Sequence, residues 1–181
     1  MTEVAIREFS ADDLTVARAA SGDQQAFAHL VTAHHAAMAK VAYAITGEVE
    51  SADDSVQTAW SIAWQRLGRL RDRGAVRPWL IAIAANEARQ AVRRRRRRPV
   101  VDISAIPEPS GGSDPSDRIE TVDLARVLQR LNADDRTLLA LRFVGGLDSG
   151  AIAIHLGMSA SGVRSRLSRL IERLRGELDH A

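Results

Sequence analysis

Six consecutive arginines, residues 93–98, carry the densest positive charge of the chain. In the segment before them, Asn86, Arg89 and Gln90 recur at helical spacing and share one face with Arg93. Guanidinium groups bind anions through paired hydrogen bonds, so this face can bind a polyanion. An arginine run taken alone is as typical of a solvated tail, a localisation signal or a heparin-type patch, and the two interpretations are separated only by the rest of the sequence.

A second set of basic and small polar side chains follows one helical face near the end of the chain. Arg164, Ser165, Arg166, Ser168 and Arg169 lie opposite or beside the apolar stripe of the same segment. Arginine can donate two hydrogen bonds to guanine, serine can reach base edges or phosphates, and flanking arginines can neutralise phosphate. These residue types favour a helix that reads a DNA groove, and an ordinary amphipathic surface helix is the alternative.

The histidines form no comparable pattern. His34 and His35 are neighbours that point in different directions on a helix, and His29 precedes them by a further turn. Metal ligands are expected three or four residues apart on one face, with further carboxylate or histidine ligands. The chain has no cysteine, which excludes disulfides and thiolate metal sites. No nucleophile, carboxylate pair or phosphate-binding loop accompanies the histidines either, so we expect no metal, no cofactor and no catalysis.

Helices are expected to position these side chains. Pro78 suits a first helical turn, and the residues after it predict a helix to Arg98. Its buried stripe would contain Leu80, Ile83, Ala84, Ala88 and Ala91. An earlier helix is predicted to start at a Ser51 cap, with Asp53 and Asp54 in its first turn, where the helix dipole favours acidic residues. Its buried stripe would contain Val56, Ala59, Trp60, Ala63 and Leu67.

Caps and glycines divide the C-terminal part into short helices. Asn132 resembles an N-cap, and a glycine pair at 145–146 ends the segment that it starts. Ser149 can cap a short helix that Gly157 ends in the left-handed conformation, and Ser159 can cap a longer one. This spacing predicts a helix-turn-helix. The apolar pattern before the glycine pair includes Leu138, Leu139, Leu141 and Phe143.

Charge is strongly segregated along the chain although the net charge is only +2. Residues 1–65 carry −6, residues 66–98 carry +10, residues 99–123 carry −5 and residues 124–181 carry +3. A basic belt after an acidic half favours nucleic acid as its partner. The segment 99–117 holds four of the five prolines and has no apolar period, so it is predicted to be a flexible linker.

The order of these features resembles the extracytoplasmic-function (group IV) sigma factors, members of the sigma-70 family of bacterial RNA polymerase factors. The resemblance rests on four motifs, which are SGDQQAFAHL (21–30), GEVESADDSVQTAW (47–60), RPWLIAIAANEARQAVRR (77–94) and GMSASGVRSRLSRLIERLR (157–175). It implies an all-α fold with two small helical domains, a sigma region 2-like bundle and a sigma region 4-like helix-turn-helix, joined by a flexible acidic Pro/Gly linker. The expected parts are an arm (1–14), the first domain (15–98), the linker (99–118) and the second domain (119–181).

The resemblance also implies binding sites. Core polymerase would bind the helix that carries Asp53, Asp54 and Gln57. The loop 68–77 and the helix after it would bind the −10 promoter element through Arg71, Arg73, Arg77, Asn86, Gln90 and Arg93. The C-terminal helix would read the −35 element through Arg164, Ser165, Arg166, Ser168 and Arg169. The other arginines of the run, residues 94–98, are expected to make mostly nonspecific phosphate contacts.

The implied function is promoter recognition and transcription initiation. Core RNA polymerase, promoter DNA and an inhibitory anti-sigma factor are the implied partners. We expect a cytoplasmic protein without membrane insertion, because no segment approaches the roughly 18 apolar residues of a membrane span and the N-terminus lacks an apolar signal region. A stand-alone two-domain helix-turn-helix regulator is the first alternative, and it predicts tight operator binding without polymerase. An enzyme that uses His34 or His35 is the second.

Overall fold

All regular structure in the described residues, 11–97 and 130–178 of the computed structural model, is helical. The N-terminal unit, residues 11–97, contains α1 (Ala11–Ala20), α2 (Gln24–Thr46), α3 (Val49–Arg66), two 3₁₀ turns, η1 (Leu67–Arg69) and η2 (Arg73–Ala75), and α4 (Val76–Arg97). The C-terminal unit, residues 130–178, contains α6 (Ala133–Leu139), the π-helical η3 (Ala140–Val144), α7 (Ser149–Leu156) and α8 (Ala160–Leu178). The predicted all-α class is confirmed. Most of the predicted arm, the whole linker and the start of the second predicted domain lie outside the described residues.

A short polar side chain sets the start of one helix in the N-terminal unit, and the starts of two others differ from the prediction. The Asp23 carboxylate accepts hydrogen bonds from the backbone N–H groups of Gln25 and Ala26 and so caps α2. The predicted Ser51 cap is wrong, because α3 begins two residues earlier. Ser51 lies in its first turn and donates to the Glu48 carboxylate over 2.9 Å. Helix α4 also starts earlier than predicted, at Val76, directly after the turn η2.

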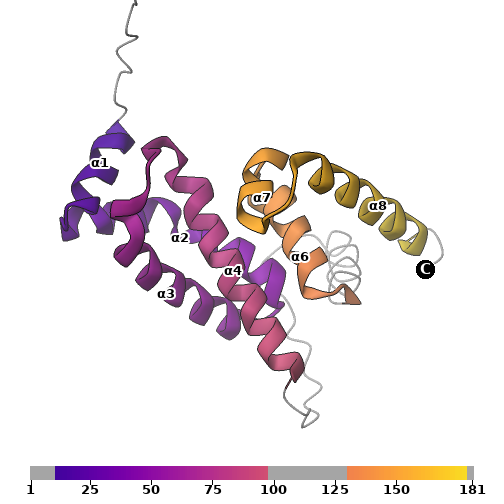
Figure 1. Ribbon diagram of the computed structural model, residues 1–181. Coiled ribbons are helices and arrows are strands. Elements are labelled where there is room, and N and C mark those ends of the chain that lie inside the picture. The colour runs from indigo at the N-terminus through magenta and orange to yellow at the C-terminus, as the bar shows by residue number, and fades with distance from the viewer. Residues whose placement is uncertain (1–10, 98–129, 179–181) are drawn as a thin grey trace, which may run out of the picture.

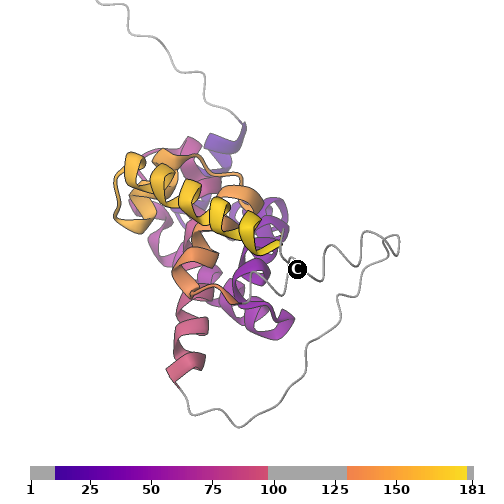
Figure 2. The same cartoon turned by 90° about the vertical axis from the view of Figure 1, so that its right-hand side faces the viewer.

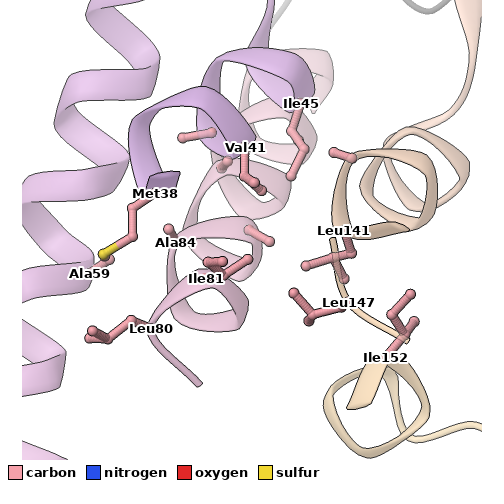
Figure 3. Close-up of a cluster of buried hydrophobic side chains, with 14 of the residues drawn as sticks. Met38, Val41, Ile45, Ala59, Leu80, Ile81, Ala84, Leu141, Leu147 and Ile152 are labelled. Atoms are coloured by element: carbon pink, nitrogen blue, oxygen red, sulfur yellow. The ribbon is translucent and has the colours of Figure 1, made fainter. Parts of the chain in front are cut away.

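Helices α2, α3 and α4 pack against one another around a core of small and medium side chains. On α3, Ala59 and Ala63 are completely buried, and Met38 of α2 lies against Ala59 (Figure 3). Small residues at these positions allow the helices to approach closely. The predicted stripe of α4 is largely confirmed, since Leu80, Ala84 and Ala88 are buried while Ile83 and Ala91 are half-buried. On α3 the prediction holds for Val56, Ala59, Ala63 and the following Leu67, and Trp60 is half-buried.

The predicted caps of the C-terminal unit are mostly confirmed. Asn132 accepts from the N–H of Asp135 over 2.9 Å, and Gly157 ends α7 with a φ of 65°. Ser159 accepts from the N–H of Gly162 at the start of α8. The Ser149 cap is wrong by one residue, because Asp148 accepts the capping hydrogen bond.

A π-helical turn changes which apolar residues of this unit are buried. The N–H of Gly145 donates to the carbonyl of Ala140, five residues back, over 2.8 Å. The wider turn keeps Leu141 in the core and leaves Phe143 62% exposed. A regular 3.6-residue period cannot predict this change, so the apolar pattern placed Phe143 with the wrong group.

The two units share one continuous hydrophobic core. Figures 1 and 2 show the C-terminal unit lying against α4, with α8 on its outer side. In Figure 3, Leu141, Leu147 and Ile152 face Ile81 and Ile45 of the N-terminal unit, and all five side chains are buried. This arrangement brings the start of α6 to the side of α4. None of the described helices is long and apolar enough to cross a membrane.

Candidate nucleic-acid interface

One face of α4 carries a linked strip of polar side chains. Arg89 donates to the Asn86 amide oxygen over 2.9 Å, and Gln90 donates to the Glu87 carboxylate over 3.0 Å. Arg93 continues the strip one turn later, with about half of its side chain exposed. The spacing predicted that Asn86, Gln90 and Arg93 share a face, and the structure brings them together. Because their side chains are amides and guanidinium groups, the strip can donate several hydrogen bonds to one anionic ligand.

Three further arginines precede this strip. Arg71 and Arg73 lie in the loop between α3 and α4, whereas Arg77 lies in the first turn of α4, and all three are exposed. Asp72 holds the loop by accepting from the N–H of Gly74 over 3.2 Å. The loop therefore has a defined turn, and its arginine side chains extend into solvent.

The arginine run has intramolecular partners in this structure. Arg93 donates to both carboxylate oxygens of Asp134 on α6, over 2.7 and 2.6 Å. Arg95 pairs with Glu48 at the corner between α2 and α3, and Arg96 donates to the carbonyl of Leu131 over 2.9 Å. Some of these side chains thus connect α4 to the rest of the protein, and the expectation that residues 94–98 make mostly nonspecific phosphate contacts stays a prediction.

The opposite charge gathers on α3. Asp53, Asp54 and Gln57 are all exposed on one side of the helix, and Ala52 and Val56 are buried on the other. Among the described residues, no polar contact fixes Asp53 or Gln57 to another element.

The predicted groove-reading residues of α8 fall into two groups. Arg164, Ser165, Ser168 and Arg169 are exposed along the side opposite the buried residues of the helix. Arg166 is different, because its guanidinium donates to the Asp135 carboxylate over 2.9 Å and is only about one third exposed. Arg166 thus stabilises the packing of α8 on α6, and it is less available for DNA than its four neighbours.

Asp135 is the anionic centre of this packing. It is buried, it accepts from Asn132 over 2.8 Å, and it lies 3.4 Å from Arg173 as well as next to Arg166. Burial favours the neutral acid, but the hydrogen bonds from Arg166 and Asn132 outweigh it and hold the pKa of Asp135 below its usual value. The carboxylate therefore stays charged at neutral pH.

His35, one of the two adjacent histidines, contacts a group of aromatic side chains. The indole N–H of Trp60 donates to Nδ1 of His35 over 3.3 Å. Phe27 packs edge-on against Trp60 and Trp64, with ring centroids 5.6 and 4.8 Å away. Within the described parts of the chain, no group of three or more potential metal ligands is placed to hold an ion.

Comparison with known families accounts for both units. The model of sigma-70 region 2 matches residues 30–98, and the model of sigma-70 region 4 matches residues 121–174. Together the two matched ranges cover about two thirds of the chain. The chain therefore belongs to the sigma-70 family, and its relatives place it among the extracytoplasmic-function members.

Individual relatives agree with this assignment. The sequence is 34% identical to the RNA polymerase sigma factor NccH of Alcaligenes xylosoxydans, covering 88% of this chain and 90% of the relative. It is 35% identical to the probable sigma factor RfaY of Xanthomonas campestris, but it spans only 42% of that protein's length. The solved structure of CnrH in complex with the cytosolic domain of CnrY superposes with a TM-score of 0.72 at 29% identity, over 94% of this chain and 99% of CnrH.

The chain is therefore an alternative sigma factor, which binds core RNA polymerase and directs promoter recognition. Sigma factors are non-enzymatic DNA-binding proteins, so the activity is not that of an enzyme. A stand-alone regulator is not favoured, because both units match parts of one sigma factor in the same order.

Two residues beside the predicted sites were missing from the sequence-based list. The spacing placed Arg89 on the same helix face as Asn86 and Arg93, but Arg89 was not included among the expected −10 contacts. Asp134 faces the strip from 41 residues away in the sequence, and no pattern in the sequence could place it there. Its position depends on the shared core of the two units.

Proposed function

We propose that the exposed face of α3 binds core RNA polymerase through Asp53, Asp54 and Gln57. The support is that these three side chains are exposed together on the side of α3 that faces away from its buried residues, Ala52, Val56 and Ala59. Two carboxylates on one face suit a basic surface on the partner, and such complementarity chiefly sets specificity and the rate of association.

The polar strip of α4 and the loop before it bind the −10 promoter element in this proposal. The residues are Arg71, Arg73, Arg77, Asn86, Gln90 and Arg93. The strip is the observation that carries the proposal, because amide and guanidinium donors line one helix face directly after three exposed arginines. Opening a base pair costs a few kcal/mol, which contacts to the extruded base and to phosphates can offset. Binding should weaken steeply with salt, as phosphate contacts require.

The exposed side of α8 reads the −35 element in the major groove. Arg164, Ser165, Ser168 and Arg169 supply the base and phosphate contacts, and Arg166 contributes mainly through its pairing with Asp135. Helix α7 and the turn at Gly157 hold α8 in the orientation of a helix-turn-helix.

Regulation by a separate inhibitory protein completes the proposal. CnrH was solved with the cytosolic domain of CnrY, and a second similar fold was solved as a sigma factor with the anti-sigma factor NepR. By likeness to CnrH, we expect this chain to be held inactive by an anti-sigma factor. Its work with RNA polymerase would place it in the cytoplasm.

Purified chain and core polymerase provide the test. Together they should start transcription from promoters of the source genome, and no start from any of them would contradict the proposal. Charge reversal by Asp53→Lys with Asp54→Lys should abolish pull-down of core polymerase, because two repulsive charges replace two attractive ones. Glu177→Lys is the matched control, since it reverses an exposed charge near the end of α8 and should leave the pull-down unchanged.

A further inference from the structure

The Asp134 carboxylate lies between two arginines of the α4 strip. Arg93 donates to its two oxygens over 2.7 and 2.6 Å, and a guanidinium nitrogen of Arg89 is 3.6 Å from one of them. Arg89 in turn donates to Asn86. The carboxylate of Asp134, a residue of the C-terminal unit, therefore lies within reach of both arginines of the strip, Arg89 and Arg93.

Docking of the two units brings this carboxylate to the strip. Arg96 donates to the carbonyl of Leu131, and Arg136 donates to the carbonyl of Ile45 over 2.7 Å, so α6 is fixed on both sides of Asp134. The buried contact of Ile81 with the C-terminal unit holds the same arrangement (Figure 3). Asp134 reaches Arg93 only while the units are docked.

A carboxylate and a phosphate use the same donors on a guanidinium group. Each presents anionic oxygens that accept charge-assisted hydrogen bonds, so both cannot occupy one arginine with full geometry. A DNA phosphate that approaches Arg93 or Arg89 must displace Asp134, and it also meets the repulsion of that negative charge.

We infer that Asp134 is an intramolecular competitor of promoter DNA, which occupies Arg89 and Arg93 when the two units are docked. The inference rests on the proposed −10 role of the α4 strip. In the docked chain the strip binds DNA weakly, and separation of the units withdraws the carboxylate and frees both arginines together. Promoter binding and domain separation are thereby coupled through one acidic residue.

The expected effect of removing this charge is modest. Asp134 is 37% exposed and Arg93 is 49% exposed, so solvent screens the pair. Exposed ion pairs contribute up to about 1 kcal/mol, which corresponds to about a fivefold change in affinity. Asp134→Asn should therefore tighten DNA binding by the full chain about two- to fivefold, while the shared apolar core keeps the units docked.

The experiment measures fluorescence anisotropy of a fluorescein-labelled single-stranded DNA of mixed sequence with the full chain at low salt. D134N is compared with wild type and with E177Q, which removes an equal charge from an exposed position on α8. D134N should bind two- to fivefold more tightly, and E177Q should bind as wild type does. In the R89Q/R93Q background, D134N should give no gain, because the arginines that it frees are absent. Thermal melts by circular dichroism check that each variant is folded, and Asp134→Ser serves as a second neutral variant at this first-turn position.

The outcomes separate the inference from the proposed function. If R89Q/R93Q weakens DNA binding but folded D134N and D134S both bind like wild type, the competition is refuted and the −10 role stands. If R89Q/R93Q leaves binding unchanged, the −10 role of the strip fails first. Equal gains for D134N and E177Q would also refute the inference, because they would show only an effect of net charge.

Discussion

The guanidinium of Arg136 in α6 donates a hydrogen bond to the carbonyl of Ile45, one residue from the end of α2, over 2.7 Å. Carbonyls in the last turn of a helix lack intrahelical partners, and this one is satisfied from the other unit. Arg136 is only 3% exposed. Burial, together with the nearby charges of Arg96 and Arg95, lowers the pKa of Arg136 to about 10, so it remains a charged donor at neutral pH.

Arg136→Met should destabilise the protein by about 2–3 kcal/mol. Methionine fills much of the same space, but it leaves the Ile45 carbonyl buried without this donor, and hydrogen bonds to charged groups contribute about that much. Urea unfolding followed by circular dichroism measures the loss. Arg142→Met is the matched control, because Arg142 also donates to a carbonyl, that of Leu147, from an exposed position. An equal loss in both variants would contradict a special role for Arg136.

Asp135→Asn should destabilise the protein at neutral pH but much less in acid. At neutral pH the change removes the charge that pairs with Arg166 and Arg173, and we expect a loss of about 1–2 kcal/mol after allowing for solvent screening of Arg166. Because folding lowers the pKa of Asp135 from its ordinary 3.8, its contribution is complete above that value and is lost as pH falls through the lower folded value.

The measurement compares the free energy of unfolding of wild type and Asp135→Asn from pH 7 downward. The difference should hold constant above the ordinary carboxyl pKa and then shrink below it. Taking the difference removes the contributions of the other carboxylates, which titrate in both proteins. If the difference in the free energy of unfolding stayed the same in acid, the effect of Asp135 would not be electrostatic.

Gly145→Ala should weaken the contact between the two units. A Cβ atom at this position would lie 2.9 Å from the carbonyl of Leu141 and 3.1 Å from Ile81 of α4. Overpacking of this kind costs about 1–3 kcal/mol. Gly176→Ala is the opposite control, because a Cβ atom at this position of α8 would meet no neighbouring atom. The free energy of unfolding should rise by up to about 1 kcal/mol, since alanine favours the helix more than glycine does. Thermal melting should therefore shift down for the first variant and up for the second.

Arg169→Ala should lower the affinity of the polymerase complex for promoter DNA by about 1–3 kcal/mol, or about five- to 150-fold. Arg175→Ala serves as the control, since Arg175 is also exposed on α8 but was not among the predicted reading residues. Electrophoretic mobility shifts on a promoter fragment measure both. A loss in Arg175→Ala as large as that in Arg169→Ala would argue for general electrostatic attraction alone.

Local patterns in the sequence were enough to predict the helices and most of their buried faces. Leu80, Ala84 and Ala88 could be assigned to the core of α4 because helical periodicity is a property of neighbouring residues. The predicted caps of two helices were displaced, by three residues at α3, where the N-cap is Glu48 without a side-chain capping hydrogen bond, and by one residue at α7, where Asp148 caps in place of Ser149. Phe143 was misplaced because a π-turn interrupts the period.

The partners of the arginines could not be predicted in the same way. Arg93 and Arg166 were both predicted to contact DNA, yet each pairs with an acid of α6 in the free chain. These pairs join residues 41 and 31 positions apart and depend on how the helices pack. Residue type and spacing show what an arginine can bind, whereas the fold determines which anion it meets first.

The continuous core between the units also places a thermodynamic condition on every partner. Separating the units would expose Ile81, Leu141 and Leu147 to water, which is unfavourable for each buried apolar side chain. A protein that binds the chain with its units apart must cover this surface or offset its exposure elsewhere. The apparent affinity of such a partner is lowered in proportion to the fraction of chains whose two units are separated. Substitutions that loosen the core should therefore make the chain less stable and, at the same time, a tighter ligand for such a partner.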